Sequence, residues 1–172
     1  MANVDDILRE VFIAGLKNAH AVEHQAMALL GRQIDRSENY PEVEAKLTAH
    51  REETEVQIER LESILEGLDE DRSVLKDAAM SLSGNMAAIG HAFADDEVLK
   101  NAFANFAFEN FEVAAYRSLI VLAERGSFTP ALDPLRTTLQ EEEAMAAWVD
   151  ANLADLTNKF VDLKAVGENA SR

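Results

Sequence analysis

Four glutamates interrupt the apolar stripes of long segments with helical periodicity. In the first such segment, 4–36, inward positions recur in steps of four and three residues, and Glu23 lies in the middle of the series. Glu109, Glu112 and Glu142 occupy corresponding inward positions in two later segments. Because carboxylates are almost never buried without a partner, we expect a helical bundle whose interior compensates these charges.

Helical periodicity covers most of the chain and predicts four long helices. Their expected ranges are 4–36, 41–68, 96–125 and 130–164. The stretch 37–40 reads as a short turn, whereas 69–95 is a long connection whose apolar spacing predicts a short extra helix. Two helical hairpins joined by one long crossover describe an all-α, ferritin-like four-helix bundle. We expect a single domain over residues 1–164 and a frayed C-terminal tail over 165–172.

The composition argues against several classes of partner. Asp and Glu number 32 against 16 Lys and Arg, a net charge of −16, which disfavours nucleic acid and anionic membranes but suits metal cations. The absence of cysteine excludes disulfides and thiolate metal sites. No run of about 18 uncharged apolar residues occurs, and the first residues lack a basic segment followed by an apolar run. A cytoplasmic location is therefore expected.

The inward glutamates and one inward histidine have the chemistry of a metal centre. His50 lies on the apolar stripe of the segment 41–68, and Glu53, three residues later, lies on the same helix face. Carboxylates and imidazole bind iron or manganese, and carboxylates can bridge two ions about 3.5–4 Å apart. Without cations, several of these carboxylates would hold protons at neutral pH. The predicted ligands of two iron or manganese ions are Glu23, His50, Glu53, Glu109, Glu112 and Glu142.

Four sequence blocks resemble the YciF/YciE-like family of bacterial stress proteins. These blocks are AHAVEHQA (19–26), HREETEVQIERL (50–61), ENFEVAAY (109–116) and LQEEEA (139–144). The block 50–61 is the most specific, and the similarity extends over most of residues 5–157. The resemblance implies a ferritin-like fold with a rubrerythrin-like bundle, a carboxylate-rich centre and a homodimer. It also implies that the six residues named above are the metal-site candidates.

The chain departs from the usual ferritin-like motif in two places. Ferritin-like oxidases generally present Glu-x-x-His on their second and fourth helices, whereas here the order on the second helix is His50-x-x-Glu53. Met145 stands three residues after Glu142, where an imidazole would be expected. A site with one histidine and several carboxylates favours harder cations.

The residues alone leave a metal-free alternative open, and they do not decide whether the protein is an enzyme. The inward glutamates could form a hydrogen-bonded network whose candidate partners are Thr54, Gln57, Tyr116 and Arg117. The protein would then be a non-enzymatic stress or interaction protein that uses the bundle as a dimeric scaffold. Glu53 lies slightly off the apolar stripe, so a surface role is also open for it.

Two further expectations concern surfaces. Phenylalanines surround the predicted helix 96–125, which implies burial on more than one side and therefore a homodimer. A cage-forming iron store is less expected, because no motif indicates the interfaces that it would need. The polar residues expected at the surface or at an interface are Glu141, Glu143, His20, His24 and His91.

Overall fold

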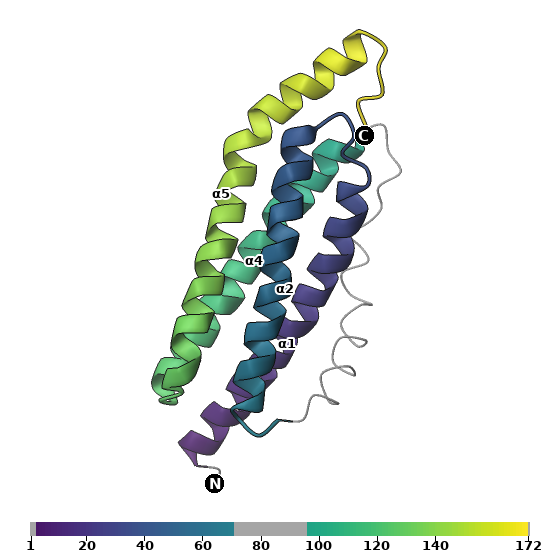
Figure 1. The fold of residues 1–172 in the computed structure, drawn as a ribbon. Coiled ribbons are helices and arrows are strands. Elements are labelled where there is room, and N and C mark those ends of the chain that lie inside the picture. Colours follow the sequence, from purple (N-terminus) through teal and green to yellow (C-terminus); the bar gives the residue numbers. More distant parts are fainter. Residues whose placement is uncertain (1–2, 71–95, 172) are drawn as a thin grey trace.

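The structure, a computed structural model of the chain, describes residues 3–70 and 96–171. All regular secondary structure within these ranges is helical (Figure 1). The helices are α1 (Val4–Ile34), α2 (Pro41–Glu66), α4 (Glu97–Arg125) and α5 (Thr129–Ala165). The predicted ranges of the four long helices agree with these bounds to within two residues. The short extra helix predicted in the long connection, and His91, lie outside the described residues.

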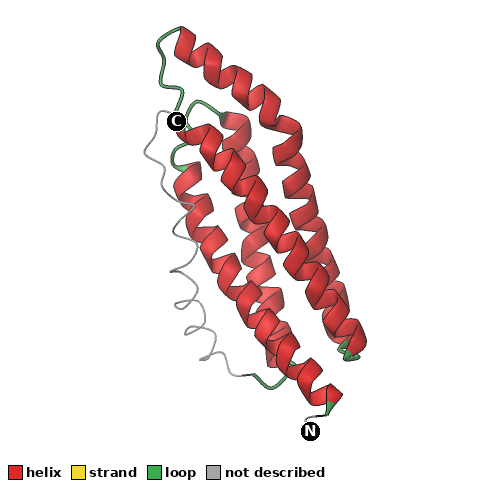
Figure 2. Ribbon diagram, turned by 180° about the vertical axis from the view of Figure 1, so that it is seen from behind, coloured by secondary structure: helices red, strands yellow, loops and turns green. Residues whose placement is uncertain are grey.

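The helices form two hairpins, α1 with α2 and α4 with α5, and the hairpins pack against each other through α1 with α4 and α2 with α5. Figure 2 shows the same bundle from behind, with its helices aligned along one long axis. In Figure 1, α2 and α4 run in the same direction, as in ferritin-like bundles. The predicted all-α four-helix bundle is therefore confirmed. No helix in the described ranges is long and apolar enough to span a membrane.

The turn between α4 and α5 is fixed against the core. Gly126 follows α4, and a Cβ atom at this position would overlap the ring of Phe128. That ring stacks on Phe12 of α1 with the ring centroids 4.7 Å apart. Glycine is needed at 126 because it allows this close approach of the ring. The positive φ in the turn, 57°, belongs to Ser127 and not to Gly126.

The core consists of two apolar clusters separated by a polar layer. The cluster toward the α4–α5 turn includes Phe12, Leu16, Leu61, Leu65, Leu119 and Leu135, and the other includes Leu30, Leu47, Val98, Met145, Val149 and Phe160. Each helix passes through both clusters and carries buried polar residues between them, as Glu23 lies between Leu16 and Leu30 on α1. A fully buried leucine or phenylalanine contributes roughly 1.5–3 kcal/mol, so the clusters offset the unfavourable burial of the polar layer.

The C-terminal segment turns back toward the α1–α2 turn. Gly167 takes a positive φ of 78° just after α5 ends. The hydroxyl of Tyr40 donates to the carbonyl of Ala170 at 2.6 Å, and Nδ2 of Asn39 donates to the carbonyl of Asn169 at 2.8 Å. The sequence predicts a frayed tail here, but the structure shows residues 169 and 170 in contact with the bundle. A buried tyrosine hydroxyl needs an acceptor, and this one finds it 130 residues away in sequence.

Candidate metal centre

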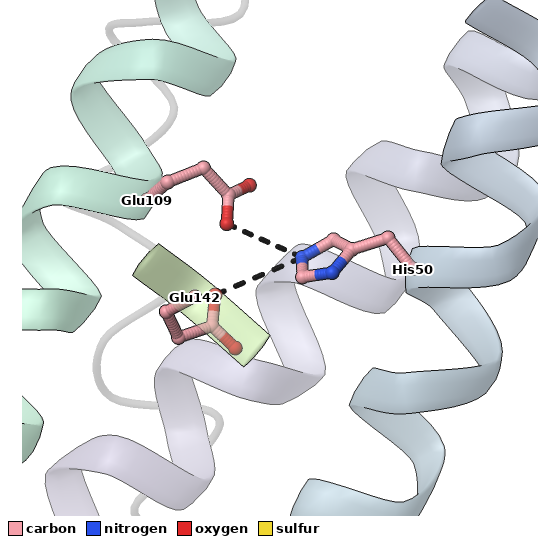
Figure 3. Close-up of side chains that lie close together, drawn as sticks. All are labelled: His50, Glu109 and Glu142. Atoms are coloured by element: carbon pink, nitrogen blue, oxygen red, sulfur yellow. Dashed lines mark ion pairs between the residues drawn. The ribbon is translucent and has the colours of Figure 1, made fainter. Parts of the chain in front are cut away.

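The polar layer brings one histidine and two glutamates from three helices to one point. His50 comes from α2, Glu109 from α4 and Glu142 from α5 (Figure 3). Nε2 of His50 lies 3.2 Å from Oε2 of Glu109 and 3.7 Å from Oε2 of Glu142. All three side chains are at most 4% exposed, and one ligand atom of each lies within 4.8 Å of the others. These three groups are close enough to share one cation.

Glu23 joins the polar layer from α1. It is almost completely buried and accepts a hydrogen bond from the hydroxyl of Tyr116. Burial raises the pKa of Glu23 to about 7, although the Tyr116 hydrogen bond and the charge of His50 act in the opposite direction. Burial and the charge of Glu23 also raise the pKa of Tyr116 well above its ordinary value, so Tyr116 remains a proton donor.

Glu112 lies one turn beyond Glu109 on α4 and is equally buried. Burial raises the pKa of Glu112 well above 4.5, and the charges of Glu23, Glu142 and Glu109 raise it further. Its Oε1 is buried and accepts no hydrogen bond from any residue that the structure describes. The burial of Glu112 and the negative charges of the other glutamates therefore favour its protonated form.

Glu142 is also strongly affected by its surroundings. Burial raises its pKa to about 11, and a hydrogen bond and charge from Glu109, together with the charge of Glu23, act in the same direction. Nε2 of Gln57 donates to Oε1 of Glu142 at 2.5 Å, which opposes the increase. At neutral pH the metal-free protein therefore carries a proton on Glu142.

Glu53 lies at the edge of the polar layer, with a side chain that is 38% exposed. Its Oε2 is 3.1 Å from Nδ1 of His50, so the ring keeps Nε2 directed toward Glu109 and Glu142. Burial by itself would lower the pKa of His50, but contacts with Glu109 and then Glu53 outweigh it and raise that pKa above 6.5. Glu53 thus contacts the imidazole from its outer side.

The structure distinguishes among the partners proposed for a metal-free network. Tyr116 and Gln57 are hydrogen-bonded to Glu23 and Glu142. Two other partners bind elsewhere: the hydroxyl of Thr54 donates to the backbone carbonyl of His50, and Arg117 donates to Glu143 on the bundle surface. Arg117 was wrongly assigned because a pattern of inward positions does not show which acid a long side chain reaches.

Glu141, which was expected to point to water, and His20, which was expected at the surface or at an interface, are both largely buried in the chain. The side chain of Glu141 is 20% exposed and is paired with Arg60 of α2, so the expectation that it points to water is wrong. His20 is 3% exposed, and its Nε2 lies 3.3 Å from Oε1 of Glu62. His24, one turn later, is exposed as expected. In both cases a charged partner on the neighbouring helix α2 holds the side chain, and a single-helix pattern cannot reveal that partner.

The surroundings of the buried carboxylate oxygens test whether the polar layer suits a metal ion. No amide or hydroxyl group among the described residues donates to Oε2 of Glu109, Oε1 of Glu112 or Oε2 of Glu142, and the nearest groups to Oε2 of Glu109 and Oε2 of Glu142 include the His50 ring. Buried polar atoms without partners are rare, and each calls for a physical explanation. Carboxylate oxygens beside one imidazole are the ligand set that iron and manganese bind. The donor set therefore fits such a cation.

The fold and the polar layer together define a class: ferritin-like four-helix bundles with carboxylates and a histidine buried at mid-height. The chain belongs to the DUF892 family, whose description is a domain of unknown function, and the sequence model of that family matches residues 7–162. Family membership confirms the resemblance to YciF-like proteins that the four sequence blocks indicate.

Individual relatives agree with this assignment. Protein YciF of Escherichia coli (strain K12) is 27% identical over 165 residues, which cover 92% of this chain and 95% of YciF. A crystal structure of a protein from Xanthomonas campestris superposes with a TM-score of 0.77 at 27% identity, covering 92% of this chain and 99% of that one. The crystal structure of the E. coli stress protein YciF gives a TM-score of 0.70 at 24% identity, covering 88% of this chain and 98% of that one.

Proposed function

We propose that this protein binds iron or manganese in the polar layer of its bundle, with two ions per chain. The proposed ligands are Glu23, His50, Glu53, Glu109, Glu112 and Glu142. The observation that carries the proposal is the buried cluster of His50, Glu109 and Glu142, whose ligand atoms lie within 4.8 Å of one another. Buried oxygens of Glu109, Glu112 and Glu142 that no amide or hydroxyl group of the described residues reaches support it, because cations would bind them in place of protons.

The residues of the layer have distinct roles in this proposal. His50, Glu109 and Glu142 hold one ion, while Glu23 and Glu112 extend the carboxylate set toward a second one. Glu53 contacts Nδ1 of His50 through Oε2 and orients the ring, and Oε1 is the atom that it would offer to a cation. When bound, iron or manganese would supply one-electron chemistry with dioxygen or peroxide. Since a relative of similar fold is described as a stress protein, we infer a role in stress response or in handling metal and oxygen.

A second candidate function is a metal-free dimeric scaffold. Tyr116 already donates to Glu23 and Gln57 to Glu142, so part of the layer is satisfied without a cation. Large apolar side chains are exposed on α1 and α4, and a second copy of the chain would cover them. They include Val4, Ile7, Val11, Phe103, Phe106, Phe111 and Val121. In both candidate functions we propose a homodimer.

Metal analysis distinguishes the two functions. We expect protein purified without chelator to contain, or to take up from ferrous iron or manganese, about two ions per chain. Glu23→Ala and Glu142→Ala should lose this binding, whereas Glu143→Ala, at the partly exposed neighbour, should keep it. A ferric absorption band should form when the ferrous protein meets air. Absence of bound metal, with stability unchanged by chelator, would support the scaffold instead.

Light scattering after gel filtration tests the dimer. The expected mass is twice that of the chain, and Phe111→Glu should shift it toward the monomer because this exposed side chain would carry a charge into the interface. A monomeric wild-type protein would exclude the homodimer. The metal proposal does not depend on that result.

A further inference from the structure

A continuous chain of polar contacts crosses the interface between α2 and α5 and ends at Glu142. It begins at Arg60, whose Nη1 and Nη2 donate to the two oxygens of Glu141 at 2.6 and 2.9 Å. Nη1 of Arg60 also lies 3.2 Å from the hydroxyl of Thr138. This two-pronged contact holds Glu141 against α2, one residue before Glu142 on α5.

Gln57 continues the chain into the core, where it is completely buried. Its Nε2 donates to Oε2 of Glu141 at 3.1 Å and to Oε1 of Glu142 at 2.5 Å. Both hydrogens of the amide are thus used. A reversed amide would place Oε1 of Gln57 against the oxygen of Glu141 that Arg60 also contacts, so Glu141 fixes the orientation of the amide.

The two oxygens of Glu142 consequently face different ways. Oε1 is held by Gln57, whereas no amide or hydroxyl group among the described residues donates to Oε2, which lies 3.7 Å from Nε2 of His50. Figure 3 shows one oxygen of Glu142 facing the His50 ring and the other turned away from it. The contact with Gln57 therefore decides which oxygen is free for a ligand.

We propose that Gln57 is a positioning residue that presents Oε2 of Glu142 to a bound cation, and that the Arg60–Glu141 pair keeps the Gln57 amide in this orientation. The inference rests on the metal function proposed above. Gln57 carries no charge, so it orients the carboxylate without adding to the negative charge that the cation must balance. A glutamine that only joined α2 to α5 would affect stability but not the coordination of the metal.

Gln33 offers a matched control for Gln57. It is also a buried glutamine, and its amide joins two helices by hydrogen bonds of 2.9 and 2.8 Å with Asn105, but it contacts none of the proposed ligands. Cobalt(II) serves as the probe, because its visible absorption depends on coordination geometry. We expect Gln57→Leu to weaken cobalt binding by about tenfold or more and to change the absorption spectrum, in the range typical of lost outer contacts to a metal ligand. Gln33→Leu should leave both unchanged.

Two arginines bind the residues on either side of Glu142 in sequence, and they give a second comparison. This comparison tests the positioning role if Gln57→Leu does not fold. Arg60 binds Glu141, whereas Arg117 binds Glu143 on the surface. Arg60→Met should weaken cobalt binding and Arg117→Met should not. The double variant Gln57→Leu/Arg60→Met should bind no more weakly than Gln57→Leu alone, because Arg60 acts through Gln57.

The outcomes separate the two proposals. If the wild-type protein binds cobalt and both Gln57→Leu and Arg60→Met keep its affinity and spectrum, the positioning role is wrong and the metal function stands. If the wild-type protein binds neither cobalt nor manganese, the metal function fails and the positioning role fails with it. A large loss of affinity in Gln33→Leu as well would show that any disturbance of the bundle weakens binding, which also overturns the positioning role.

Discussion

Replacing Glu142 by glutamine should stabilise the metal-free protein at neutral pH. The new side chain keeps the size of the old one and an oxygen that can accept from Gln57, but it has no proton to gain or lose. In the folded wild type, burial raises the pKa of Glu142 to about 11, against 4.5 for an ordinary glutamate. Folding at pH 7 therefore takes up a proton at this position, and the variant avoids that requirement.

The size of the effect follows from linkage. A raised folded-state pKa makes the native protein most stable below pH 4.5 and progressively less stable as the pH rises from 4.5 toward 11. Between pH 4.5 and pH 7 the unfavourable contribution grows to about 3.4 kcal/mol, since each pH unit corresponds to about 1.36 kcal/mol. The contribution of Glu142 at pH 7 is set by its unfolded-state pKa, because the folded-state pKa lies well above 7. We therefore expect the free energy of unfolding of Glu142→Gln to be about 3 kcal/mol higher than that of the wild type at pH 7 and equal to it near pH 4.5.

Urea denaturation in the presence of chelator, followed by circular dichroism across this pH range, measures the difference directly. Manganese or ferrous iron at about 1,000 times its Kd should reverse the order, because ligand at this excess stabilises the wild type by about 4.1 kcal/mol and the variant loses a ligand. Glu143→Gln is the control and should change stability by no more than about 0.5 kcal/mol. A metal-free Glu142→Gln that is less stable than the wild type at pH 7, or a difference independent of pH, would refute the reasoning.

Three further predictions concern the rest of the bundle. Phe12→Ala should lower the free energy of unfolding by about 3–5 kcal/mol in urea titrations, because it removes a fully buried ring; a loss below about 1 kcal/mol would contradict the packing described. Gly126→Ala should lower the same free energy by about 1–3 kcal/mol, because its Cβ would displace the ring of Phe128 from Phe12; an unchanged melting temperature would argue against that contact. Tyr40→Phe should lower the free energy of unfolding by about 1–3 kcal/mol and speed proteolysis of the C-terminal segment, because the carbonyl of Ala170 loses its donor. Equal cleavage rates in the variant and the wild type would contradict the docking of this segment on the bundle.

Much of the fold could be read from local patterns. The four helices were predictable because an apolar residue every three or four positions is a property of each helix alone, and the prolines at 41 and 130 mark where two of them begin. The same periodicity showed that Glu23 and Glu142 face inward, as their burial bears out. The docking of Ala170 on Tyr40 could not be predicted, since it depends on a contact between two segments far apart in the chain.

The sequence by itself determined which side chains enter the interior, because the direction of a residue on a helix follows from its position in the repeat. Only the tertiary structure decided which of them meet. It placed His50, Glu109 and Glu142 at ligand distance, left Glu53 at the edge, and turned Glu141 toward Arg60. The physical reason is that contacts between charged side chains depend on the rotation and spacing of neighbouring helices. Those quantities are set by how the two apolar clusters pack, and no single helix contains them.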